Sequence, residues 1–195
     1  MNQTYQIRNI MTIKELWALT VADTVVNKGN AKAETFYEKL KSIIYLLWFS
    51  PSFVCVFYFR INQYLAHKHN RFAYFFARTL EARRIYKFGN DISMWAQVGP
   101  GLRLVHLSGI VIGRRVIAGK NLTLLNDVTL GERKVGDDKM PKIGHDVYIG
   151  TGAKILGGIT IGDNVVLGAL TFCNKSLPSN SVAYRKNSPL IVDIQ

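Results

Sequence analysis

The segment IGHDVYIGTGAKILGGITIGDNVVLGALTF, residues 143–172, repeats one pattern every six positions. A period of six fits neither the 3.6-residue period of an amphipathic helix nor the alternation of an ordinary strand. It predicts a coil of short strands that turns a corner every six residues and stacks on the coil beneath it. Glycine follows most of the repeated aliphatic residues, and we expect it to supply the backbone angles of the corners. The repeated residues, which such a coil buries in its core, are Ile143, Ile149, Ile155, Ile161 and Leu167.

The six-residue rhythm begins after Gly89-Asn90, which divides the chain into an α-helical region, residues 1–90, and a mostly β coiled domain, residues 91–195. The rhythm shifts by two positions at residues 106–109, where we expect the coil to bulge. A second interruption, the polar segment 132–142, predicts a loop that leaves the wall. A repeating wall specifies a scaffold and no reaction, so the interruptions are where function is to be sought.

Four helices are expected before the coil. Between residues 42 and 59 no side chain is charged, which is about the length of a short membrane span. Ser50-Pro51-Ser52 interrupts this run, and because proline disfavours a continuous helix we expect two shorter helices rather than a span. The last helix mixes phenylalanine with arginine, which fits either an element on a membrane surface or a helix packed on the domain with its arginines in water. The expected helices cover residues 12–26, 33–49, 53–67 and 71–86.

The chain is strongly basic, with 25 Lys and Arg against 13 Asp and Glu and a formal charge of +12. No zinc-ligand set or stacking motif for nucleic acid accompanies this charge, so we expect no nucleic-acid partner and instead anionic phosphates of a coenzyme or a membrane surface. Cys55 and Cys173 stand in apolar runs, which predicts buried thiols in a reducing compartment. The first long apolar run begins near Ile43, too late for a secretory signal. We therefore expect a cytoplasmic protein that can contact the inner membrane peripherally.

Four histidines are candidates for chemistry. His67 and His69 belong to a polar helix end, and His145 occupies an ordinary corner, whereas His106 lies at the expected bulge. Asp91 stands fifteen residues before His106, and an aspartate that holds one imidazole nitrogen leaves the other free as a base. A histidine that merely caps a coil explains His106 equally well on spacing alone. A zinc site of this kind needs about three histidines, so no metal is expected.

Longer motifs occur at three places: DI…VG…L…H…GIVIG at residues 91–113, VTLG at 128–131, and PKIG…VYIGTGAKILGGITIGDNVVLGA at 141–169. From about residue 80 onward the chain resembles the serine acetyltransferase family of left-handed parallel β-helix acyltransferases, and looks closest to the branch found in bacterial polysaccharide loci. The resemblance implies a left-handed parallel β-helix after a helical region, acetyl-CoA as the acetyl donor, and a homotrimer with active sites between neighbouring prisms.

The same resemblance implies roles for individual residues. His106 would be the general base that takes the proton of the acceptor hydroxyl, and Asp91 would orient it. Basic residues near the C-terminus, namely Lys175, Arg185 and Lys186, are candidates for the coenzyme phosphates, although each fits a solvated surface charge equally well. The residues small enough to let a pantetheine arm lie along the coils are Gly150, Gly152, Ala153, Gly168 and Ala169.

The departures from the family concern the acceptor. Serine acetyltransferases carry an aspartate where this chain has Val105, and Arg-His where it has Lys139-Met140. The family tail that docks on cysteine synthase is also not matched, so no such complex is expected. These changes predict an O-acetyltransferase that acts on a sugar hydroxyl of a bacterial surface polysaccharide or its lipid-linked precursor. Serine is the alternative acceptor, and a non-catalytic hexapeptide scaffold is a third interpretation.

Overall fold

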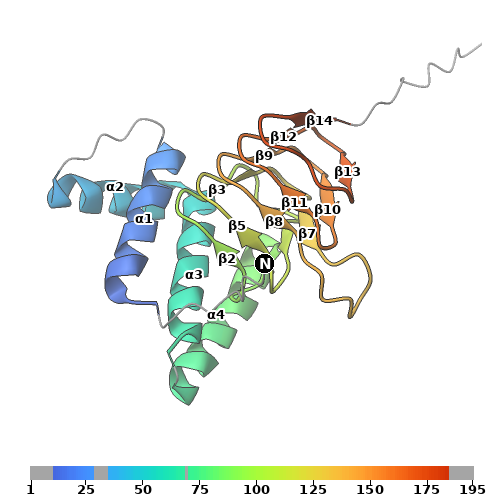
Figure 1. The fold of residues 1–195 in the computed structure, drawn as a ribbon. Coiled ribbons are helices and arrows are strands. Elements are labelled where there is room, and N and C mark those ends of the chain that lie inside the picture. The colour runs from blue at the N-terminus through green and yellow to red at the C-terminus, as the bar shows by residue number, and fades with distance from the viewer. Residues whose placement is uncertain (1–10, 29–34, 69, 185–195) are drawn as a thin grey trace, which may run out of the picture.

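The computed structural model describes residues 11–28, 35–68 and 70–184, which form four helices followed by a column of short strands (Figure 1). Thr35 caps the second helix by accepting from the Glu38 amide, and Glu38 bonds back to the Thr35 amide. Ser50 caps the third helix, whose first residue is Pro51, because proline fits a first helical turn. The third helix therefore starts two residues earlier than expected. The helices are α1 (Ile13–Lys28), α2 (Phe36–Phe49), α3 (Pro51–Ala66) and α4 (Arg71–Phe88).

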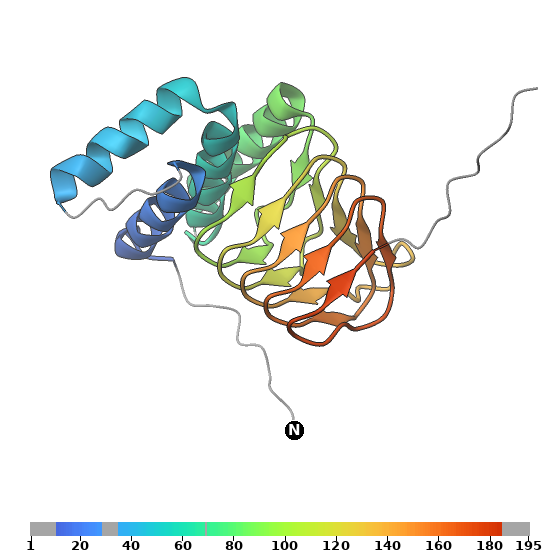
Figure 2. The same ribbon diagram turned by 90° about the horizontal axis from the view of Figure 1, so that it is seen from above.

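The strands form three parallel sheets that enclose a three-sided prism. This confirms the stacked coil predicted from the repeat and the fold class implied by the family resemblance, a left-handed parallel β-helix after a helical region. Figure 2 shows the coils stacked in a column that leads away from the helices. Sheet A contains β1 (Asp91–Ile92), β4 (Val111–Ile112), β7 (Thr129–Gly131), β10 (Lys154–Leu156) and β13 (Phe172–Cys173). Sheet B contains β2 (Gln97–Val98), β5 (Ile117–Ala118), β8 (Lys142–Ile143) and β11 (Thr160–Ile161). Sheet C contains β3 (Arg103–Leu104), β6 (Thr123–Leu124), β9 (Tyr148–Ile149), β12 (Val166–Leu167) and β14 (Val182–Ala183).

The repeated aliphatic residues fill the prism, as the six-residue period predicts. Ile149, Ile155, Ile161 and Leu167 have no exposed surface, and Ile143 retains 4%. The glycines that follow them have a different role from the one expected. A Cβ on Gly144 would lie 2.7 Å from the carbonyl oxygen of Gly162 in the next coil, so these glycines allow the coils to approach. The left-handed backbone angles of that edge belong instead to polar residues, namely Asn121, Asp146, Asn164 and Asn180.

The two interruptions of the rhythm are both present. Six residues, 105–110, lie between β3 and β4, whereas four lie at the same corner of each later coil, at 125–128, 150–153 and 168–171. The bulge at His106 is thereby confirmed. The polar loop, residues 132–141, connects β7 to β8. The loop therefore interrupts a different corner of the prism, between sheets A and B.

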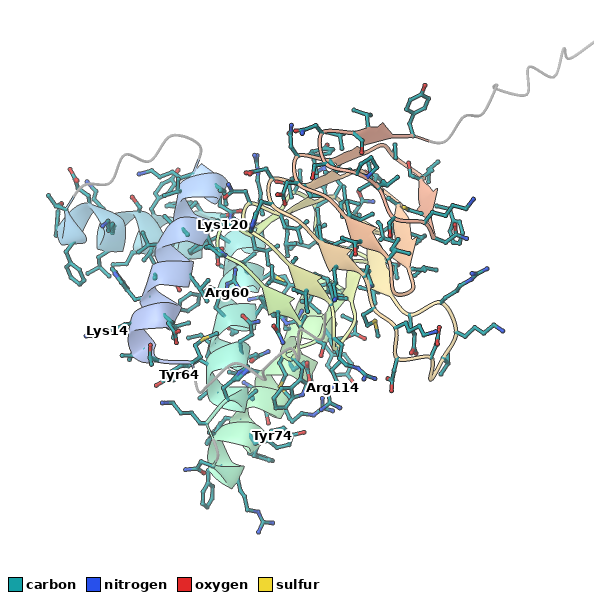
Figure 3. All side chains as sticks on the ribbon, viewed as in Figure 1. Lys14, Arg60, Tyr64, Tyr74, Arg114 and Lys120 are labelled. Carbon is teal, nitrogen blue, oxygen red and sulfur yellow. The ribbon has the colours of Figure 1, made fainter. Side chains whose placement is uncertain are left out.

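The helices close the end of the prism where the first coil has no coil beneath it (Figure 3). Arg60, fully buried on α3, donates to the carbonyl oxygens of Val98 and Gly99 at 2.7 Å each and forms a 2.8 Å ion pair with Asp23 of α1. The Asp23 carboxylate also accepts hydrogen bonds from two backbone amides of the first coil. The buried charges are therefore satisfied by the backbone that they cap. Other helix side chains that bond this backbone are Asn27, Gln63, Glu81 and Arg84.

Among the described residues, no single helix is long and apolar enough to cross a membrane. Helices α2 and α3 reach that length only together, and they are bent by 112° at the break between them. Ser50 occupies this break and Pro51 begins α3, so the helix is interrupted where the sequence predicts. The uncharged run thus forms two separate helices.

Candidate active site

The candidate residues lie on two different edges of the prism. His106 and Val105 belong to the corner between sheets C and A, and Asp91 opens the first strand of sheet A; we call this the His106 edge. Lys139 and Met140 belong to the loop between sheets A and B, which we call the loop edge. One copy of the chain therefore brings His106 and the acceptor candidate Val105 together at one edge, but places the acceptor candidates Lys139 and Met140 at another.

The bulged corner packs directly against the segment that carries Asp91. The Gly109 amide donates to the Gly89 carbonyl at 2.7 Å, and the Asp91 amide donates to the Ile110 carbonyl at 2.8 Å. The side chains of Asp91 and His106 are both exposed to solvent. Within the described part of the chain, no hydrogen bond joins the Asp91 carboxylate to the His106 imidazole. The backbone thus brings the two segments side by side, and the catalytic pairing stays a prediction.

A buried polar cluster between the helices and the His106 corner was not predicted from the sequence. Asn90 is 2% exposed and donates from its side-chain amide to the Leu107 carbonyl at 3.4 Å and to the Cys55 sulfur at 3.2 Å. Arg84, 1% exposed, donates to the Asn90 side-chain oxygen at 2.6 Å. Burial lowers the pKa of the Arg84 guanidinium and raises the pKa of the Cys55 thiol. Thus α3 and α4 reach the residue next to His106 through Asn90.

The small residues proposed for the coenzyme lie along the His106 edge, two and three coils beyond His106. Ala153 is completely buried in the core, so its side chain points into the prism and not onto the surface of the edge, and its role in coenzyme binding stays a prediction. A Cβ on Gly150 would lie 2.7 Å from the Ala169 amide nitrogen, and Gly152 has a φ of +71°. The structure therefore requires glycine at both positions whether or not a coenzyme binds there. Gly168 is partly exposed and Ala169 is exposed, which leaves these two on the surface of the edge.

The three basic candidates are separated from these small residues. Lys175 is exposed but follows β13 on the loop edge, away from the small residues. Its carbonyl oxygen accepts a 3.2 Å hydrogen bond from the Cys173 thiol, whose pKa is raised by burial. Arg185 and Lys186 lie outside the described residues. A phosphate role for any of the three stays a prediction.

The loop edge contains a cationic hollow beside Met140. Met140 is partly buried and packs against the core, next to Gly113. Arg115 forms an ion pair with Asp138, and Lys139 approaches Asp137 at 3.7 Å. Both pairs are largely exposed and are therefore weak. The hollow is lined by Arg115, Asp138, Lys139, Met140, Lys142, Gly158 and Thr160.

The remaining histidines have structural partners, except one that is not described. The Nδ1 atom of His145 accepts the Lys120 amide at 2.9 Å, so His145 helps to stack neighbouring coils. His67 places its Nδ1 2.6 Å from the Gln63 carbonyl oxygen at the end of α3. His69 lies outside the described residues. His106 is thus the histidine of the coil that remains available for chemistry among those the structure describes.

Comparisons with known proteins point in one direction. The family described as bacterial transferase hexapeptide (six repeats) matches residues 140–175. The serine acetyltransferase of Helicobacter pylori is 39% identical over 121 residues, which cover 61% of this chain and 71% of that protein. The soybean serine acetyltransferase complexed with serine is 31% identical with a TM-score of 0.73, over 89% of this chain and 68% of that one. The isoform 3 enzyme of Entamoeba histolytica, in complex with cysteine, matches in fold with a TM-score of 0.74 at 24% identity, and the chain spans 60% of it.

Proposed function

The chain belongs to the serine acetyltransferase family of hexapeptide-repeat acyltransferases, and from that premise we propose that it is an acetyl-CoA-dependent O-acetyltransferase with His106 as its general base. The observation that carries the proposal is the His106 corner. It is two residues longer than the same corner of later coils, and it exposes an imidazole beside the segment that bears Asp91. A structural histidine needs no such extension, as the ordinary corner with His145 demonstrates.

The proposed reaction is a direct transfer. The His106 imidazole takes the proton of the acceptor hydroxyl while the hydroxyl oxygen attacks the thioester carbonyl of acetyl-CoA. A carbon–oxygen bond forms, the carbon–sulfur bond breaks, and the imidazolium returns the proton to the leaving coenzyme thiolate. Asp91 orients the ring and stabilises the imidazolium, as a carboxylate does in hydrolytic triads. A positioned base of this kind contributes about 10²–10⁴ in rate.

We propose that two copies of the chain complete each active site, within a homotrimer. His106 and the loop with Lys139 and Met140 flank opposite edges of sheet A, so a neighbouring copy must supply one of the two groups. Gly168 and Ala169 on the His106 edge are the surface along which we place the pantetheine arm. Sedimentation that gives a stable monomer at micromolar concentration would contradict the shared site.

For the acceptor, serine has better support than the sugar expected from the sequence. The relatives reported above are serine acetyltransferases, and none of them supports a polysaccharide acceptor. We therefore propose serine as the acceptor. Lys139, in the cationic hollow of the loop edge, is the group to which we assign the serine carboxylate. Asp137 and Asp138 on the same loop are exposed carboxylates, and to them we assign the serine ammonium group.

A sugar hydroxyl remains the second candidate because of two apolar side chains. Val105, half-buried beside His106, and Met140, packed on the core, stand where the family has a charged or imidazole group. Serine carries an ammonium and a carboxylate, and both need partners when they leave water. A sugar has neutral hydroxyls and apolar C–H faces, which Val105 and Met140 can contact without leaving a charge unpaired.

Release of the coenzyme thiol by the purified full chain separates these candidates. Serine, a panel of free sugars and lipid-linked oligosaccharides are compared as acceptors, with the His106→Ala variant as the blank and His145→Ala as the matched control. Turnover of serine at millimolar concentration, better than any glycan and lost only in His106→Ala, is the expected result. Preference for a glycan would replace serine by the second candidate. Thiol release that is absent with every acceptor, or unchanged in His106→Ala, contradicts the proposed mechanism.

A further inference from the structure

Helix α4 presents an aromatic face to solvent that the active site does not use. Phe72 is 78% exposed, Phe75 66%, Phe76 57% and Tyr86 89%. These exposures are unusual, because aromatic side chains of this size normally bury most of their surface. A contiguous apolar surface of this kind commonly marks an interaction site.

Basic side chains accompany these aromatics, and acidic ones do not. Arg71, Arg83 and Lys87 are exposed on the same helix. At 100° per residue Arg83 falls within the arc that holds the aromatics, and Arg71 and Lys87 lie within about 40° of the two ends of that arc. The single acidic residue of α4 is Glu81, which is 6% exposed and accepts the Met94 amide at 3.0 Å. We call this surface the α4 outer face; it consists of Arg71, Phe72, Phe75, Phe76, Arg83, Tyr86 and Lys87.

The opposite side of α4 fixes the direction of this face. Ala77, Glu81 and Arg84 are buried, and α4 packs along α3. Arg84 reaches the backbone of the first coil and Glu81 caps it, so the helix cannot rotate without breaking buried hydrogen bonds. Figure 1 shows α3 and α4 projecting beyond the prism, with the first turn of α4 at the far end. The aromatic residues near that turn are therefore held outward at an end of the molecule.

We propose that the α4 outer face binds the surface of an anionic lipid bilayer. Aromatic rings interleaved with Lys and Arg match an interface in which acyl chains lie just beneath anionic headgroups. A second copy of the chain is a poorer occupant, because symmetric pairing of two such faces would oppose Arg71, Arg83 and Lys87 to one another without an exposed carboxylate on α4. The chain as a whole carries a formal charge of +12, which favours the same anionic surface.

The exposed aromatics of α2 provide the matched control. Tyr37 is 73% exposed and Trp48 82% exposed, so they resemble Phe72 and Phe75 in exposure. They belong to a helix in which Glu38 offsets part of the charge of Lys39 and Lys41. Serine at either pair removes comparable aromatic surface without opening the core. The two double variants, Phe72→Ser with Phe75→Ser and Tyr37→Ser with Trp48→Ser, therefore differ mainly in which helix they change.

Flotation of the full chain with lipid vesicles tests the proposal. One set of vesicles is phosphatidylcholine alone, and the other is phosphatidylcholine mixed with phosphatidylglycerol. We expect the protein to float with the mixed vesicles at low salt and to be released as salt rises. Replacement of Arg71, Arg83 and Lys87 by glutamine should lower the partition coefficient about fivefold per charge, hence about a hundredfold in total. The α4 serine variant should lower it at least about tenfold, and the α2 serine variant should leave it unchanged.

Three results would overturn the proposal. The first is the absence of flotation with either set of vesicles. The second is binding that is equal for both lipid compositions or is lost in the α2 variant and kept in the α4 variants. The third is a change of oligomeric state in the α4 variants, measured by sedimentation without lipid, which would assign the face to a second copy of the chain.

Discussion

Replacement of Asp23 by alanine should destabilise the protein severely, although Asp23 lies far from the candidate active site. The carboxylate is 1% exposed and accepts four hydrogen bonds. Two come from the Arg60 guanidinium at 2.8 and 3.1 Å, and two from the amides of Gly101 and Leu102 at 2.9 and 2.8 Å. Alanine removes all four hydrogen bonds and leaves the Arg60 charge buried without its counter-ion. It also leaves the amides of Gly101 and Leu102 at the end of the prism without the Asp23 acceptor.

The magnitude follows from these contacts. Breaking a buried ion pair from one side costs about 3–5 kcal/mol, because the remaining charge has no compensation. A buried amide without an acceptor costs about 1–3 kcal/mol. The three losses share one carboxylate and some solvent will enter, so they do not add fully, and we expect a total of at least about 4 kcal/mol. Whole domains have about 5–15 kcal/mol of stability, so the variant should be close to unfolding.

Urea denaturation followed by circular dichroism measures this loss. Glu15→Ala provides the control, because it removes one carboxylate from the same helix at an exposed capping position, where about 0.5–2 kcal/mol is at stake. Asp23→Asn separates charge from hydrogen bonding, since asparagine keeps an acceptor for the coil amides and should fall between the wild-type protein and alanine. A loss below about 1 kcal/mol in Asp23→Ala would refute the account of the prism end as a buried charged cap.

Other expected outcomes can be checked with simple variants. His106→Ala should lower the rate of acetyl transfer by about 10²–10⁴ with the fold retained, and Asp91→Asn should lower it less; steady-state kinetics and circular dichroism measure both. His145→Ala should keep full activity and lose about 1 kcal/mol in urea, because a coil amide loses its acceptor. Cys55 should resist thiol reagents until the protein unfolds. Burial raises the pKa of the Cys55 thiol in the folded protein above the ordinary value of 9.0. The contribution of this thiol to the free energy of unfolding is therefore fully present below pH 9.0 and is lost as the pH rises through the folded pKa.

The prism and its bulge were predictable because a hexapeptide coil is built from local, repeated information. Each repeated aliphatic residue has the same environment, so its burial follows from the period alone. The extra residues at 105–110 shift the phase of everything that follows, which makes the bulge visible in the sequence. The prediction that the glycines form the corners was wrong because it used the same period. The period does not distinguish a glycine that turns the chain from one that lets two coils approach, as Gly144 does.

The helical cap was not predictable from the same kind of reading. Arg60 and Asp23 are 37 residues apart in the sequence, and a charged residue within a helix ordinarily faces water. On α4, Arg83 is exposed and Arg84 is buried, although they are neighbours of the same type. Arg84 differs from Arg83 because it faces the end of the prism. There the carbonyl groups of the first coil need donors, and no lower coil supplies them. Burial of polar residues therefore depends on which backbone groups the rest of the fold leaves unpaired.

The buried polar cluster also connects three parts of the molecule that the sequence presents as separate. Arg84 of α4 bonds Asn90, and Asn90 bonds the carbonyl of Leu107, the residue next to His106. The opposite side of the same helix is the exposed α4 outer face. Because α4 is held by buried hydrogen bonds, its position and the position of the His106 corner cannot vary independently. The helical region is thus a structural part of the candidate active site, and the bilayer proposed to bind α4 would also fix how the His106 edge faces the membrane.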